Sequence, residues 1–470
     1  MTLDRRDLLR LGALGSVGAM SRRLAAFANS PSGASIEPDA KVLFVFDRGG
    51  NDGVNTVIPL GDADYPTARG NIAIPPGSTI PIPGSTYAAL HPALTRLQTA
   101  MSTGSVAFLH AVGTDNPTRS HFVEMQKLET AEEAPATALK KEGFVPRLVE
   151  EARSGVLPTV AGVSVADQVQ RMFRTTDPDR ILTHIRSLQE YTFGSLAPNV
   201  RLKGAPPSAQ LPDGEGLWGA ASFQNPTDEI DRLIRGTGVN LCETELPLQA
   251  VSGLLYPSGH NAALYPTSPA EVTALGLPSG PERDALMSGQ SYNFMRNMEE
   301  AVAILLNTPA NAVGVDLGGF DTHQSQLPQH ERLLHILGWA LNSVYEDTIE
   351  TGLLVVVMTE FGRTNEVNAS DGTDHGVGTA FIAMGNGVNP GVYNCAATGS
   401  LQFGAPWIPL LTPPADPRYA NAVTPQTHFQ TVLAEICERH FGLAPAMVDA
   451  VIPGITSKIG RLYRRLGFLQ

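Results

Sequence analysis

Continuous apolar runs recur along the chain, and each has the character of a strand buried on both faces. The runs are KVLFVF (41–46), GSVAFLHAVG (104–113), NAVGVDL (311–317), LLVVVM (353–358) and TAFIAM (379–384). They lack the alternation of apolar and polar residues that marks a half-exposed strand, which is typical of parallel sheets covered by helices. The pattern predicts an α/β fold with a mostly parallel central sheet.

The segment SQLPQHERLLHILGWALNSVYEDT between the third and fourth runs carries apolar residues at helical spacing. A helix of about 18 residues between two buried strands is a βαβ crossover, which joins parallel strands. After the second run, DNPTRSHFVEMQKLETA predicts a loop that opens a helix near Thr118. The fold class is therefore helices flanking a sheet.

Residues 203–290 differ in amino-acid composition from the rest of the chain. They are rich in Pro, Gly and Ser, as in KGAPPSAQLPDGEG, and are too long for a plain loop. We interpret them as an insertion or cap over the sheet, with a short helix near PTDEIDRLIRG. The predicted organisation is one α/β domain over residues 41–460 that contains this insertion.

The N-terminal segment resembles an export signal. Arg5 and Arg6 precede a short apolar run, and Ala26-Phe27-Ala28 suits signal-peptidase cleavage, so residues 1–28 resemble a twin-arginine signal peptide. The run is shorter than the ~20 residues that span a bilayer, so we expect no permanent membrane anchor. The resemblance implies a periplasmic or extracellular protein that uses the twin-arginine translocation machinery.

The composition of the chain disfavours some classes of protein. The 470 residues are 42% hydrophobic and 17% charged, which is ordinary for a globular protein. The formal net charge of −13 becomes −16 when residues 1–28, with five Arg and two Asp, are removed (−13 − 3). Nucleic-acid binding needs a basic surface and is therefore not expected. The three cysteines are too few for a disulfide scaffold, although one pair could form.

Polar residues follow the predicted strands, where parallel sheets collect ligands. After the first run, FDRGGNDGVNT brings Asp47 and Asp52 to a strand tip beside three glycines that let the backbone approach a ligand. The alternative is a tight turn that the aspartates cap. After the third run, Asp321 and His323 lie two residues apart, so in an extended segment both point the same way and could share one cation. Alternatively, Asp321 caps the following helix.

A third cluster lies between the fourth and fifth runs and contains Glu360, Arg363, Asn368 and the segment GTDHG with Asp374 and His375. Imidazole and carboxylate together favour ions such as zinc, manganese or iron. The planar guanidinium of Arg363 suits an oxyanion or a carboxylate, and a structural ion pair is the alternative.

The segment RSHF places Arg119, Ser120 and His121 at another strand exit, near a helix N-terminus that attracts anions. A plain helix cap by Thr118 or Ser120 is the alternative. Charged groups at several buried strand ends would be costly without partners, so the sequence predicts that these clusters meet.

The order of VFxRGGNDGVNTVIPLGD, TRSHFVEMQ, GGFDTHQSQ, VVVMTEFGRT and NxSDGTDHG, over about residues 41–443, resembles the exported family known as domain of unknown function 1501, within the alkaline-phosphatase-like superfamily. The chain departs from the family pattern at Asp47, Thr359 and His428. The resemblance implies an alkaline-phosphatase-like fold, and the well-studied members of that superfamily hydrolyse phosphate or sulfate esters, or move phosphoryl groups, with bound metals.

Carried over to this chain, the resemblance implies one metal site at Asp321, His323 and His375 and a second at Asp52 and Glu360 with Asp374. The ions would be Zn, Mn or Ca. Arg119 or Arg363 would stabilise charge in the transition state, with His121 in the same cluster. The nucleophile stays open among Thr56, Ser120 and a metal-bound hydroxide.

The leading hypothesis is an exported metal-dependent hydrolase of a small-molecule or polymer ester. The alternative is a non-catalytic exported protein of the same fold that binds a surface polymer or a partner. A cofactor-dependent oxidoreductase is disfavoured because no dinucleotide fingerprint is present.

Overall fold

Each of the five apolar runs forms a strand of the central sheet. A computed structural model describes residues 36–133, 142–155, 157–175, 177, 180–191, 229–256, 258–349, 351–396, 401–402, 405–406 and 416–470. The five runs form β1 (Val42–Arg48), β5 (Val106–Gly113), β8 (Ala312–Gly318), β9 (Leu354–Met358) and β10 (Thr379–Met384).

Over this part of the chain the sheet has the strand order β11-β5-β10-β9-β1-β8-β6-β7, with β14 paired to β5. The added strands are β6 (Gly162–Val165), β7 (Thr183–Ile185), β11 (Gly391–Tyr393) and β14 (Thr427–His428). Strands β7, β6, β8, β1 and β9 pair in parallel, and only β10, among the described strands of this sheet, runs antiparallel to its neighbours β9 and β5. The α/β, mostly parallel sheet is confirmed.

The direction of β10 brings the polar clusters together. Because β10 is antiparallel, it begins at the edge where β1, β5, β8 and β9 end. The segment GTDHG that precedes β10 therefore lies at the same edge as the loops that follow the other four strands. The shared position comes from a strand reversal in a mixed sheet, whereas a purely parallel sheet would place this segment at the opposite edge.

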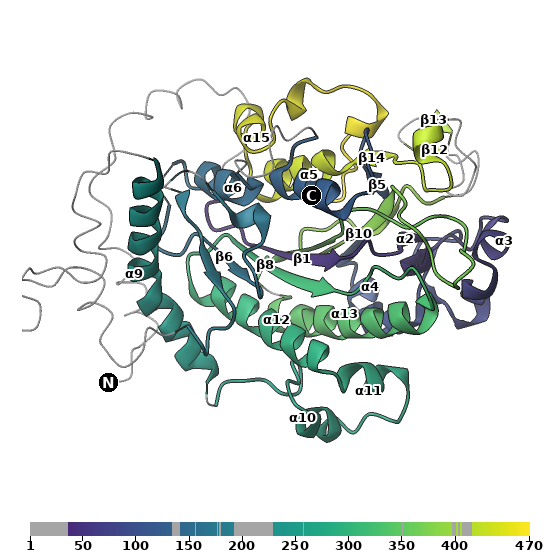
Figure 1. The fold of residues 1–470 in the computed structure, drawn as a ribbon, viewed down its shortest axis with the longest axis horizontal. Helices are drawn as coiled ribbons and strands as arrows, with labels where there is room; N and C mark the ends of the chain where they lie inside the picture. Colours follow the sequence, from purple (N-terminus) through teal and green to yellow (C-terminus); the bar gives the residue numbers. More distant parts are fainter. Residues whose placement is uncertain are drawn as a thin grey trace, which may run out of the picture.

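One face of the sheet is covered by two long helices, α12 (Gly289–Asn307) and α13 (Gln326–Thr348) (Figure 1). Helix α13 connects β8 to β9, which flank β1 in parallel, so the predicted crossover is confirmed. It has 23 residues rather than about 18, because the helix already begins at Gln326. Its apolar residues recur at helical spacing and are buried against the sheet: Leu333, Leu334, Ile336, Leu337, Ala340, Leu341 and Val344.

The opposite face is covered by α5 (His121–Thr130), α6 (Phe144–Ala152), α14 (Phe429–Glu435) and α15 (Pro445–Val451) (Figure 1). Side chains of a strand alternate between faces, so Leu43 and Val45 enter the core under α12 and α13 while Phe44 enters the other core. There the Phe44 and Phe144 rings meet edge to face, 5.3 Å apart. Both faces of β1 are thus buried, which explains its uninterrupted apolar sequence.

Part of the segment read as an insertion is described. Residues 203–228 lie outside the described residues, and the predicted short helix is the long helix α9 (Glu229–Leu255), 27 residues with Pro247 inside it. Helix α9 contacts α12 and β7, whereas α11 (Pro281–Leu286) packs on α13 and α12. Figure 1 shows α9 at the end of the sheet that carries β6, and α10 (Pro269–Ala274) and α11 beyond the α12–α13 layer. These helices do not cover the edge that carries the polar clusters.

Shorter elements complete the described chain. They are α2 (Gly53–Thr56), α3 (Tyr65–Arg69), α4 (Gln98–Ser102), β2 (Val57–Ile58), β3 (Ile80–Pro81), β4 (Ala89–Leu90), β12 (Leu401–Gln402) and β13 (Ala405–Pro406). Short 3-10 helices lie at Gly70–Ile72, Pro76–Ser78, Pro92–Leu97, Arg171–Phe173, Pro417–Tyr419, Ile455–Ser457 and Arg461–Tyr463, and a π-helical turn at Ile436–His440.

The signal peptide predicted at residues 1–28 lies outside the described residues. In the described ranges, no helix combines the length and the apolar character needed to cross a bilayer. Cys395 and Cys437 are free, buried thiols, and burial raises the pKa of both. These two cysteines therefore do not form the single disulfide that the cysteine count allowed.

Candidate metal centre

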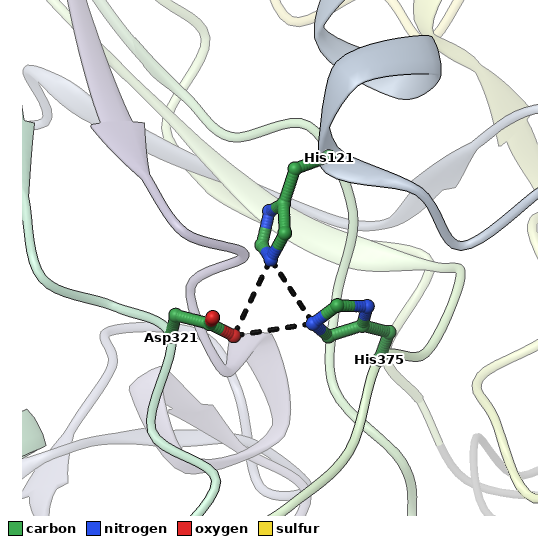
Figure 2. A group of neighbouring side chains, drawn as sticks. All are labelled: His121, Asp321 and His375. Carbon is green, nitrogen blue, oxygen red and sulfur yellow. Dashed lines mark hydrogen bonds and ion pairs between the residues drawn. The ribbon is translucent and has the colours of Figure 1, made fainter.

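Four side chains from three loops converge at the sheet edge. His121 begins α5 after β5, Asp321 and His323 follow β8, and His375 precedes β10. The Nε2 atom of His375 lies 3.0 Å from Nε2 of His121 and 2.9 Å from Nε2 of His323. Oδ1 of Asp321 lies 3.3, 3.0 and 3.2 Å from Nε2 of His121, His323 and His375, respectively. Figure 2 shows three of these side chains pointing at a common centre.

These separations match the spacing of ligand atoms around a small cation. Zinc binds imidazole nitrogen at about 2.0–2.1 Å, so the ligand atoms of a tetrahedral ion lie about 3.3 Å apart. His121, Asp321 and His375 form a group that could hold a metal ion, the only such group of three or more among the described residues. His323 adds a fourth donor at the same edge. The predicted convergence of Asp321, His323 and His375 is therefore present, and His121 joins them.

The second nitrogen of each histidine has an acceptor. Nδ1 of His121 lies 2.6 Å from Oε1 of Glu360, and Nδ1 of His323 lies 2.9 Å from Oδ1 of Asp374. Nδ1 of His375 lies 2.8 Å from the carbonyl oxygen of Arg119. A proton on each Nδ1 satisfies these acceptors and leaves the Nε2 lone pairs facing one another and a carboxylate. This arrangement is repulsive unless a cation or added protons lie between them.

Outer carboxylates commonly orient histidines that ligate metals. Glu360 takes this position behind His121, and Asp374 takes it behind His323. Both were predicted as direct ligands of a second ion. In the structure, Oε1 of Glu360 accepts from His121 and from the Gly49 N–H (3.0 Å), while Oε2 accepts from the Thr359 hydroxyl (3.1 Å). The carboxylate of Glu360 is fully buried and occupied by these donors.

The charges of the centre follow from these contacts. Burial opposes ionisation of Asp321, but the hydrogen bond from Arg363 lowers its pKa to about 2, so the carboxylate is ionised. The hydrogen bond to Glu360 raises the pKa of His121, whereas burial lowers the pKa of His375. The side-chain exposure of Asp321 is 46% and that of His323 is 43%, against 22% for His121 and 24% for His375. The centre therefore has a buried side and an open side.

Arg363 was predicted to act on an oxyanion or to steady a carboxylate, and the structure supports the second role. Its side chain is fully buried and donates from Nη2 to Oδ1 of Asp321 at 2.6 Å. Its other N–H groups bond carbonyl oxygens of the three neighbouring loops, at Gly49, Gly50, Phe320 and Thr373. Arg363 therefore holds Asp321 and the loops in place and is not available to a substrate.

Glycines allow these loops to approach each other. Gly49 has φ +114°, and a Cβ there would lie 2.5 Å from the backbone nitrogen of Asp321. A Cβ at Gly372 would lie 2.3 Å from the carbonyl group of His323. The glycines of FDRGGND and of GTDHG thus bring backbone segments into contact at the centre. The glycines were expected to let the backbone approach a ligand, and in the structure the neighbours that they approach are other loops.

Arg119 connects to the centre through its backbone. Its φ of 57° lies in the left-handed region, which is strained for a non-glycine residue and is enriched at functional sites. This conformation accompanies the hydrogen bond between its carbonyl oxygen and Nδ1 of His375. Its guanidinium donates to the carbonyl oxygens of His375, Arg418 and Ala420, and no acidic partner is present among the described residues. Arg119 therefore brings an uncompensated positive charge beside the centre.

The predicted hydroxyl nucleophiles do not contact the centre. Oγ1 of Thr56 is buried and bonds Oδ1 of Asn51 and the carbonyl oxygen of Asp52, both at 2.9 Å. Ser120 is the N-cap residue of α5, and its side chain makes no capping hydrogen bond. Thr56 belongs to a buried polar network and lies apart from the donors. Ser120 lies next to His121 in the chain, and nothing further assigns it a role.

Asp52, the other predicted ligand of a second ion, lies in a buried ion pair outside the group of donors. Its fully buried carboxylate lies 2.6 and 2.9 Å from the guanidinium of Arg69, accepts from Gln326 at 2.5 Å and caps α2. Burial opposes ionisation, but Arg69 lowers the pKa of this carboxyl. Asp47 is also buried, and burial raises its pKa well above the usual range. Asp52 therefore stabilises the loop as a cap, as the alternative expected, whereas Asp47 lies in β1 and accepts from the side chain of Asn51.

Residues 304–400 match the model of the family described as protein of unknown function (DUF1501). This supports the family that the sequence motifs suggested. No curated protein matches the chain. The matched segment contains β8, α13, β9 and β10 and three of the four donors, Asp321, His323 and His375. His121 lies outside the match, so the family segment and the α5 region together build the centre.

The role of Glu360 leads to a prediction. Glu360→Gln is expected to lower metal affinity by about 10- to 100-fold. The neutral amide is a weaker acceptor than the carboxylate for the Nδ1–H of His121, so the imidazole becomes a weaker ligand. Affinity is measured by competition with a chromophoric chelator. Glu366→Gln, an exposed residue of the same loop, is the matched control and should bind as the wild type does. Equal affinity in Glu360→Gln would show that the carboxylate does not support the ligand.

Proposed function

We propose that the protein is an exported, metal-dependent hydrolase of phosphate or sulfate esters, with a substrate that is unknown. The observation that carries the proposal is the convergence of three Nε2 atoms and one ionised carboxylate, with each Nδ1 already bonded to an acceptor. Such a set of lone pairs suits a divalent cation. The resemblance to the alkaline-phosphatase-like superfamily supports ester hydrolysis as the chemistry.

The donor set also limits which metal ions the centre would favour. Imidazole nitrogen suits zinc and iron and carboxylate oxygen suits manganese, whereas calcium prefers six to eight oxygen ligands. Three imidazoles and one carboxylate therefore favour Zn or Mn over Ca. The described residues supply donors for one ion, since Asp52 pairs with Arg69 and Glu360 lies behind His121.

The charge around the centre favours an anionic substrate. Arg119 has no acidic partner in the described ranges and touches the backbone of His375. A phosphate or sulfate ester presents oxyanions that a guanidinium and a cation both stabilise. In hydrolysis the water oxygen bonds to phosphorus or sulfur, the bond to the ester oxygen breaks, and a water proton passes to the leaving oxygen. A divalent cation bound at the centre would lower the pKa of that water.

A second candidate function rests on the number of donors. Four protein ligands fill a tetrahedral ion, as in structural zinc sites, whereas catalytic sites keep one position open. A closed centre would fit a non-catalytic exported protein that binds a surface polymer or a partner. The half-exposed side chains of Asp321 and His323 favour the catalytic reading, because structural sites are usually enclosed.

The test uses purified protein and a panel of aryl phosphates and aryl sulfates, assayed with added Zn, Mn or Ca. Hydrolysis of one ester class is expected, with loss of activity on adding chelator and recovery on restoring the metal. Activity that is indifferent to chelator would overturn the proposal. No activity with any ester, while one equivalent of metal stays bound, would favour the binding protein.

A further inference from the structure

The centre has one donor more than an open catalytic zinc site uses. Catalytic zinc commonly has three protein ligands and one position for water or substrate. Here the ligand atoms of His121, Asp321 and His375 all lie within 4.8 Å of one another, while Nε2 of His323 stands outside that group, 2.9 Å from Nε2 of His375 and 3.0 Å from Oδ1 of Asp321. An ion held by all four has no free tetrahedral position, so the donors differ in role if the centre binds a substrate.

Two of the donors are held by buried partners. His121 bonds Glu360, whose carboxylate is fully buried and also accepts from the Gly49 N–H and the Thr359 hydroxyl. Asp321 accepts from Arg363, which is itself bonded to backbone carbonyl oxygens. Moving either donor would break hydrogen bonds in the protein interior, which is expensive where water cannot replace them.

His375 is anchored through backbone. Its Nδ1 bonds the Arg119 carbonyl oxygen, and the residue forms an isolated bridge with Arg363. Its ring also packs against Phe361, with ring centroids 4.9 Å apart. The hydrogen bond at Nδ1 and the packing against Phe361 therefore fix the position of the His375 ring.

His323 is anchored differently. Its side chain is 43% exposed, and the carboxylate behind it, Asp374, is 61% exposed. A hydrogen bond between exposed groups contributes little, because water replaces either partner. His323 can leave the centre and keep its contact to Asp374 or exchange it for water. Among the four donors, His323 is therefore the side chain that can be displaced from the centre at the lowest cost in free energy.

We propose that His323 is an exchangeable ligand that an oxyanion oxygen of the substrate replaces at the metal. The other three donors, which form the group in Figure 2, remain bound throughout. The inference rests on the proposed metal centre and assigns its substrate position to the solvent-facing side. It also explains why a site with four donors would still act on an ester.

The test uses the full purified protein loaded with Co²⁺, whose visible absorption reports the number of ligands, and inorganic phosphate as the probe. In the wild type, phosphate is expected to change the spectrum toward that of phosphate-bound His323→Ala. In His323→Ala, Co²⁺ stays bound with at most about a tenfold loss of affinity, and phosphate binds about tenfold more tightly because it displaces no side chain. His121→Ala and His375→Ala are expected to lose more than about 100-fold in Co²⁺ affinity.

The controls separate the outcomes. Gln324→Ala changes an exposed neighbour of His323 and should bind Co²⁺ and phosphate as the wild type does. His323→Gln repeats the test with a side chain of similar size. If both His323 variants lose Co²⁺ as completely as His121→Ala, His323 is a permanent ligand and the inference is overturned while the metal centre stands. If the wild type binds no Co²⁺, the proposed metal centre itself fails.

Discussion

Asp321→Asn is expected to remove stoichiometric metal binding, with a loss of affinity of more than about 100-fold. Oδ1 of Asp321 is the atom on which all three Nε2 atoms converge, and it is the anionic donor of the centre. The amide keeps an oxygen that can accept from Arg363, so the buried guanidinium retains a partner. The protein should therefore stay folded, and the loss should reflect the missing charge at the ion.

Metal content is measured after dialysis, together with the dissociation constant from chelator competition. Asp371→Asn is the matched control, since Asp371 is an exposed aspartate of the neighbouring loop with a positive φ of 56° that Asn tolerates. It should bind metal as the wild type does. Unchanged metal content in Asp321→Asn, with circular dichroism unaltered, would remove the basis of the metal centre.

The buried strands and the shared sheet edge could be predicted because both follow from local pattern. Uninterrupted apolar runs specify strands covered on both faces, and polar residues directly after such runs must leave the core. Asp321 and His323 were found in this way, whereas His375 precedes β10 and was assigned to the metal site through the family resemblance. The direction of β10 was not predictable from its sequence, since TAFIAM would serve a parallel or an antiparallel strand equally well.

The division of work among the polar residues depends on side-chain orientation, which spacing does not encode. Glu360 directly follows a buried strand, yet it faces the Nδ1 atom of His121 and not the centre. The role of Arg119 is carried by its carbonyl oxygen and its left-handed backbone, for which its residue type gives no signal. His121 was placed in the same cluster as a catalytic residue, and only its contacts with Asp321 and His375 identify it as a donor.

A second large effect is expected from Asp52→Asn, and it concerns stability rather than metal. The Asp52 and Arg69 side chains are both fully buried and form two hydrogen bonds, at 2.6 and 2.9 Å. Removing one partner of a buried pair leaves an uncompensated charge and lowers the free energy of unfolding by about 3–5 kcal/mol. Metal binding by the folded variant should remain, because Asp52 does not belong to the group of donors.

Denaturant unfolding measures the first effect, and chelator competition at low temperature measures the second. Asp167→Asn is the control, since its ion pair with Arg186 is exposed and should contribute less than about 1 kcal/mol. The two readouts distinguish the buried pair from a ligand. If Asp52→Asn is as stable as the wild type but no longer binds metal, Asp52 is a metal ligand and not mainly a partner of Arg69. Neutralising a carboxylate that only binds the ion would leave the fold intact.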